Sequence, residues 1–155
     1  MPGPSTPITL ITVSKPTRNF VYLASQSPRR AQLLTQLGVE FQTLLPDGHE
    51  DAEALEAILP RETAQAYVQR VTRLKLEAAR RRLKERQLPP APVLCADTTV
   101  AIRSEILGKP RDAAHARGML HQLSGRTHCV LTAVALGSSR KTAMVLSRSE
   151  VTFGA

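Results

Sequence analysis

Residues 23–30 read Leu-Ala-Ser-Gln-Ser-Pro-Arg-Arg and carry the groups best suited to chemistry in this sequence. Ser27 and Pro28 predict the start of a helix, because serine caps helix N-termini and proline suits the first helical position. The free N–H groups at a helix N-terminus attract anions. The guanidinium groups of Arg29 and Arg30 match phosphate oxygens. The segment therefore predicts a phosphate site, with a capped surface helix carrying solvated arginines as the alternative.

Asp97 is the second residue whose surroundings suggest chemistry. It lies within Val-Leu-Cys-Ala-Asp-Thr-Thr-Val at 93–100, and this apolar context predicts a central strand. A buried carboxylate without a partner is costly, so Asp97 must meet a cation, a metal ion or a strand end. Two interpretations stay open: a structural salt bridge, or a catalytic or metal-binding role.

Three further residues are weaker candidates when taken alone. Lys109 lies between a glycine and a proline, in a turn that can orient its ammonium group. Glu50 belongs to an acidic, irregular stretch at 46–60, for which a hydrated loop is the simpler interpretation. Lys75 lies in the basic segment 70–86, most of which is expected to form the solvated face of a long helix. The sequence contains no P-loop and no dinucleotide-binding glycine motif.

The 155-residue length and the composition predict one domain with an aliphatic core, because hydrophobic residues make up 42% and aromatic residues 3%. The net charge of +8 favours anionic partners. A nucleic-acid-binding module is one such alternative, although no aromatic residues interleave with the cations of the basic segment. Cys95 and Cys129 lie in apolar runs and are expected to be buried and reduced, as in a cytoplasmic protein. No membrane or export signal is recognised, and residues 1–18, which hold four prolines, read as a loose leader.

Apolar spacing along the rest of the chain predicts strands that alternate with helices, which indicates an α/β fold. The first helix is expected to bury a stripe formed by Leu33, Leu34 and Leu37. The expected strands are 19–25, 39–45, 93–102, 127–136 and 142–153, and the expected helices are 28–37, 62–87 and 112–123.

In this order the segments resemble the Maf (septum formation) family of nucleoside triphosphate pyrophosphatases, and most closely its dTTP/UTP pyrophosphatase branch. The resemblance implies a Maf-like, inosine triphosphatase-like fold over residues 19–155, with a mixed twisted sheet flanked by helices and a cleft between two lobes. The second lobe is expected to be truncated, because the family-like sequence stops at Gly154. The matching motifs are 23–30, Glu50, 67–75, Ala-Asp-Thr-Thr-Val at 96–100, Gly-Lys-Pro at 108–110, 123–128, 132–134 and 150–153.

The resemblance also implies a reaction, the hydrolysis of dTTP or UTP to the monophosphate and pyrophosphate. Asp97 is the expected catalytic residue, and Glu50 with Asp97 is expected to hold a divalent metal cation, Mg²⁺ or Mn²⁺. A nucleotide-binding relative with weak or no catalysis is a second interpretation. The expected partner is a nucleoside triphosphate, with no membrane and no specific nucleic acid, and a homodimer stays open. The residues expected to bind phosphate are Ser25, Ser27, Arg29, Arg30, Lys75 and Lys109.

Overall fold

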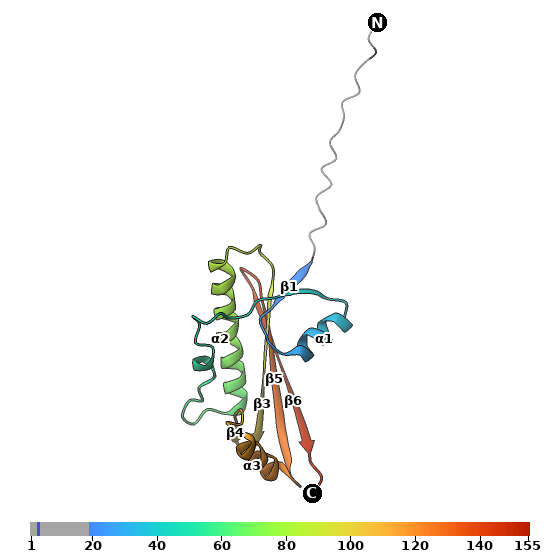
Figure 1. The fold of residues 1–155 in the computed structure, drawn as a ribbon. Coiled ribbons are helices and arrows are strands. Elements are labelled where there is room, and N and C mark those ends of the chain that lie inside the picture. Colours follow the sequence, from blue (N-terminus) through green and yellow to red (C-terminus); the bar gives the residue numbers. More distant parts are fainter. Residues whose placement is uncertain (1–2, 4–18) are drawn as a thin grey trace.

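The computed structural model describes residues 3 and 19–155 (Figure 1). The leader predicted for residues 1–18 lies, apart from Gly3, outside the described residues. Every predicted strand and helix of residues 19–155 is confirmed; the short strand β4 and the 3-10 helix η1 were not predicted. The elements are β1 (Phe20–Leu23), α1 (Pro28–Gln36), β2 (Glu40–Thr43), η1 (Glu53–Glu56), α2 (Ala64–Glu85), β3 (Val93–Ile102), β4 (Glu105–Leu107), α3 (Ala113–Leu123), β5 (Thr127–Gly137) and β6 (Thr142–Thr152).

The strands form one mixed six-stranded sheet in the order β2-β1-β3-β5-β6, with β4 also paired to β3. β1 runs parallel to β2 and β3, whereas β3, β4, β5 and β6 pair with one another antiparallel. Figure 1 shows the long helix α2 on one side of the sheet and α1 on the other. The predicted α/β class, with a mixed sheet flanked by helices, is therefore confirmed.

One edge of β3 is paired along only part of its length. The candidate site lies beside the unpaired part. Its other edge pairs with β5 from Val93 to Ala101. On the partly paired edge, β1 pairs only at Val93 and Leu94, and β4 pairs only from Val100 to Ile102. No described strand pairs with residues 95–99 on this side, because β1 ends at Leu23 and the chain turns into α1 there. Asp97 therefore lies in the middle of an open edge.

The core lies between α2 and the sheet. One cluster gathers Tyr22, Leu44 and Leu76 around Cys95, and a second surrounds Val68. On the far side of the sheet, α1 buries only Leu34. The predicted stripe of three leucines is wrong for two of them, since Leu33 is 56% and Leu37 75% exposed.

The basic segment 70–86 is less solvated than predicted. Arg82 is buried, and Arg80 donates to the carbonyl oxygens of Ser138 and Lys141 in the turn between β5 and β6. Arg70 forms an ion pair with Glu62 at 2.7 Å. Much of the positive charge of this helix therefore has partners inside the protein, which weakens the case for a nucleic-acid-binding module.

Both cysteines are free, and Cys95 is buried while Cys129 is only partly buried. Burial raises the pKa of the Cys95 thiol to about 11, so it stays protonated at neutral pH. Among the described helices, none combines the length and the apolar character that a membrane crossing requires.

Candidate functional site at the open edge of β3

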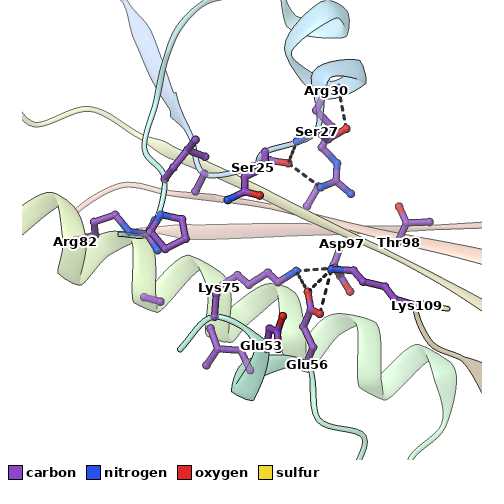
Figure 2. A pocket seen from close by; sticks show the side chains of 18 residues that line it. Ser25, Ser27, Arg30, Glu53, Glu56, Lys75, Arg82, Asp97, Thr98 and Lys109 are labelled. Atoms are coloured by element: carbon purple, nitrogen blue, oxygen red, sulfur yellow. Dashed lines mark hydrogen bonds and ion pairs between the residues drawn. The ribbon is translucent and has the colours of Figure 1, made fainter. Parts of the chain in front are cut away.

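A cleft of about 520 Å³ opens beside the unpaired edge of β3 (Figure 2), and we call it the main cleft. The β1–α1 junction forms one wall, α2 and η1 form the opposite wall, and β3 runs between them. A lysine from the loop after β4 completes the lining. The polar side chains that line the main cleft are those of Ser25, Gln26, Ser27, Arg30, Glu53, Glu56, Lys75, Arg82, Asp97, Thr98 and Lys109.

At the start of α1, two serines fix one arginine in place. The Ser27 hydroxyl accepts a hydrogen bond from the backbone N–H of Arg30 at 3.5 Å, as expected of an N-cap. The Ser25 hydroxyl accepts from the backbone N–H of Ser27 at 3.2 Å and from Nη1 of Arg30 at 3.0 Å. The guanidinium group of Arg30 is therefore held at the cleft wall, next to the free N–H groups of the helix. Arg29 is exposed and does not line the main cleft.

Across the cleft, the ammonium group of Lys75 bridges two carboxylates. Its Nζ atom donates to Oδ1 of Asp97 at 2.9 Å and to Oε1 of Glu56 at 2.8 Å. Lys109 forms an ion pair with the same glutamate, and its Nζ atom lies 3.3 Å from Oε2 of Glu56. Asp97 thus has the cation that its position in a central strand required. The salt-bridge interpretation is confirmed, and its place in the cleft keeps the chemical role open.

The ion pair of Glu56 and Lys75 shifts both pKa values toward the charged forms. Burial alone would raise the pKa of Glu56, but the hydrogen bonds and charges of Lys75 and Lys109 outweigh it, so the pKa lies below its ordinary value. Burial alone would lower the pKa of Lys75, but Glu56 and Asp97 outweigh it and raise that pKa. At neutral pH Glu56 and Lys75 therefore form a charged pair in the main cleft.

Glu50 lies elsewhere, in an ion pair with the buried Arg82. Nε and Nη2 of Arg82 donate to the two oxygens of Glu50 at 2.8 and 3.0 Å, while Nη1 donates to the carbonyl oxygen of Leu44 at 2.8 Å. The hydrogen bonds from Arg82 lower the pKa of Glu50 despite partial burial. Glu50 does not line the main cleft. The structure therefore does not bring Glu50 and Asp97 together as the predicted metal-binding pair.

Among the ion-paired residues that line the main cleft, Glu56 and Arg82 were not predicted from the sequence. Glu56 is one of several acids in the irregular stretch 46–60, and nothing in the sequence distinguishes it from its neighbours. Arg82 could have been found, since it follows Lys75 by seven residues, which is two helical turns, and so shares its helix face. The structure brings six of the predicted site residues together in the main cleft: Ser25, Ser27, Arg30, Lys75, Asp97 and Lys109.

The structure is that of a mixed α/β protein with a cleft where its first strand leads into a helix. The family model for Maf-like protein matches residues 20–155. The chain therefore belongs to the Maf family, as the sequence motifs indicated.

Several curated relatives share most of the chain. A protein of Albidiferax ferrireducens named dTTP/UTP pyrophosphatase is 65% identical, covering 88% of this chain and 68% of the relative. Proteins of Polaromonas sp. and Cupriavidus pinatubonensis with the same name are 62% and 58% identical, covering 89% and 88% of this chain and 68% of each relative.

Proposed function

We propose that this chain hydrolyses nucleoside triphosphates, dTTP and UTP in particular, between the α and β phosphates. The products are the nucleoside monophosphate and pyrophosphate. The observation that carries the proposal is the meeting of Arg30, Lys75 and Asp97 in one cleft beside a helix N-terminus. The names of the three relatives support the same reaction and the same two substrates.

The cations of the main cleft suit the charge of the substrate. A triphosphate carries several negative charges, and its hydrolysis develops more charge on the leaving pyrophosphate. Arg30 can donate to phosphate oxygens through two nitrogens, while Lys75 and Lys109 supply mobile point charges. Ser25, Ser27 and the free N–H groups of α1 complete the phosphate site. The predicted role of Arg29 stays a prediction, because its side chain lies outside the lining.

The carboxylates of the main cleft suit a divalent cation better than the predicted pair does. Magnesium in phosphate-transfer sites typically takes one or two carboxylates together with phosphate oxygens. Asp97 and Glu56 both contact the Nζ atom of Lys75, so their oxygens face one point in space. Glu50, by contrast, lies outside the main cleft, where it pairs with Arg82. We therefore propose that Asp97 and Glu56 would hold Mg²⁺ or Mn²⁺ in place of the Lys75 ammonium group, which would turn toward the phosphates. The bound ion would polarise the α-phosphoryl group.

Asp97 is the proposed catalytic residue. Its carboxylate can accept a hydrogen bond from a water molecule and orient one lone pair of that water toward the α phosphorus. As the water oxygen bonds to phosphorus and the bond to the bridging oxygen breaks, a proton passes from the water to Oδ of Asp97. Lys75, next to Asp97, can turn from the carboxylates to the departing pyrophosphate and stabilise its new charge.

The test compares two arginine variants by pyrophosphate release from dTTP. Arg30→Ala should lower kcat/KM about a hundredfold, because it removes a bidentate contact to the triphosphate. Arg73→Ala is the matched control, since Arg73 is exposed on α2 and does not line the main cleft. Equal activity of both variants, or no pyrophosphate release by the unmodified protein, would contradict the proposal.

We also propose a cytoplasmic location, which the two free cysteines support. A single sheet built from strands between Phe20 and Thr152 supports treating residues 19–155 as one domain. The homodimer stays a prediction that size-exclusion chromatography with light scattering would test.

A further inference from the structure

The outer edge of β6 is long, and no described strand pairs with it. β6 is the last strand of the sheet, beyond β5 (Figure 1). It pairs with β5 without interruption over its 11 residues, contains no proline or glycine, and has no buried side chain. Proline, bulges and short length are the devices that keep edge strands from pairing with other chains. The edge of β6 therefore offers a template for a further strand.

The direction of the backbone groups decides which residues of β6 can pair at this edge. The carbonyl oxygen of Lys141 accepts from the backbone N–H of Ser138 at 2.9 Å, and the N–H of Phe153 donates to the carbonyl oxygen of Arg126 at 3.2 Å. Both contacts are made toward the side of β5, and backbone groups alternate in direction along a strand. The odd-numbered residues of β6 therefore bond to β5. The even-numbered residues of 142–152 turn their N–H and C=O groups outward.

Two of these outward-bonding residues carry opposite charges. The side chains of Arg148 and Glu150 are 61% and 69% exposed, and their charged groups lie 3.9 Å apart along the strand. In an antiparallel pair of β6 strands related by a two-fold axis, centring on Ser149 places each Arg148 opposite the Glu150 of the other copy. Centring on Arg148 or on Glu150 would oppose like charges, which is destabilising.

We propose that two copies of this chain pair through β6, antiparallel and centred on Ser149, so that their sheets become one. In this register the even-numbered residues of 146–152 exchange backbone hydrogen bonds with the second copy.

The apolar side chains of the edge fit the same register. Val145 lies beside Val134 on the face of the sheet away from α2, and it opposes Phe153 of the second copy. Val145 is 67% and Phe153 38% exposed in the single chain. Because aromatic and β-branched side chains pair favourably across strands, this contact adds to the charge pairs at the centre.

The main cleft stays open in this dimer. It lies beside the edge of β3 that faces away from β5. Since β6 lies beyond β5, the second copy adds to the opposite side of the sheet. Each copy therefore keeps its own cleft, and the inference does not rest on the proposed function.

Charge reversal at the centre of the interface tests the pairing, by sedimentation equilibrium of the full chain at several concentrations. Arg148→Glu should weaken the dimer about tenfold, because the two-fold axis applies each change twice. Adding Glu150→Arg to that variant restores opposite charges across the interface. The dissociation constant should then return to within about threefold of that of the unmodified protein. Arg140→Glu is the matched control, since Arg140 is exposed in the turn before β6 and outside the paired residues.

A change that leaves the charges alone tests the same register. Val145→Thr keeps the β-branched shape and removes apolar contact with Phe153 of the second copy, so it should weaken the dimer about threefold. A monomeric unmodified protein at concentrations up to about 100 μM would overturn the inference. A double variant as weak as Arg148→Glu alone would also overturn it. A dimer that releases no pyrophosphate would instead contradict the proposed function.

Discussion

Replacing Lys75 with methionine removes the ammonium group that joins the two carboxylates of the main cleft. The side chains of Asp97 and Glu56 are only 16% and 24% exposed, so water cannot fully replace the lost partner. A hydrogen bond to a charged group contributes about 1.5–3 kcal/mol in general. Two such bonds are lost, but methionine packs well and water reaches part of the site, so we expect a loss of about 2 kcal/mol in the free energy of unfolding.

The loss should depend on pH in a way that identifies its cause. The folded-state pKa of Glu56 lies below 4.5, so its stabilising effect is present above pH 4.5 and disappears as the pH falls through that lower pKa. The folded-state pKa of Lys75 lies above 10.5, so its effect is present below pH 10.5 and disappears as the pH rises through the higher pKa. The difference between the two proteins should therefore be largest between these limits and shrink in acid.

Urea denaturation followed by circular dichroism, at pH 7 and at pH 3.5, measures this difference. Lys84→Met is the matched control, because Lys84 is an exposed lysine of the same helix and does not line the main cleft. Equal stability of Lys75→Met and the unmodified protein at pH 7, or the same loss of stability at both pH values, would contradict this role of Lys75. Turnover of dTTP by this variant should fall about a hundredfold, since a charge that stabilises the leaving group is gone.

Two further variants test contacts that α2 makes with the loop after β2 and with the β5–β6 turn. Arg82→Met should cost about 2 kcal/mol in thermal or urea unfolding, because it leaves the partly buried Glu50 without its guanidinium partner. Unchanged stability would mean that this ion pair does not hold the 44–56 loop. Gly137→Ala should cost about 1–2 kcal/mol, because a Cβ atom there would lie 2.5 Å from Nη2 of Arg80 and force that side chain off the β5–β6 turn. Arg80→Ala should then show little further loss in the Gly137→Ala background, and additive losses would contradict the shared cause.

The fold was largely predictable because its local signals agree with one another. Ser27, Thr63 and Asp112 each cap a helix through the side chain, and apolar spacing identified the long strands. The exposure of Leu33 and Leu37 could not be predicted, since helical spacing says which residues share a face but not whether another element covers it. β4 was missed because it is only three residues long and gains its structure from pairing with β3.

The site was predictable where residue type and position act locally. The β1–α1 junction is built from adjacent residues, so the motif of its proposed phosphate site was visible in the sequence. The partners of Lys75 were not visible, because Glu56 and Asp97 reach it from 19 and 22 residues away. Glu50 was expected in the cleft, but it pairs with the buried Arg82 instead. Because Arg82 is far from Glu50 in the sequence, no local pattern indicates this pairing.

The most direct test of the account is the identity of the products formed from dTTP. Phosphorus NMR of the unmodified protein with dTTP and Mg²⁺ should show dTMP and pyrophosphate appearing in equal amounts. Asp97→Asn, which keeps the shape of the side chain but removes its charge, should slow both by about a hundredfold or more. Formation of dTDP and inorganic phosphate, or an Asp97→Asn variant as fast as the unmodified protein, would contradict the central claim.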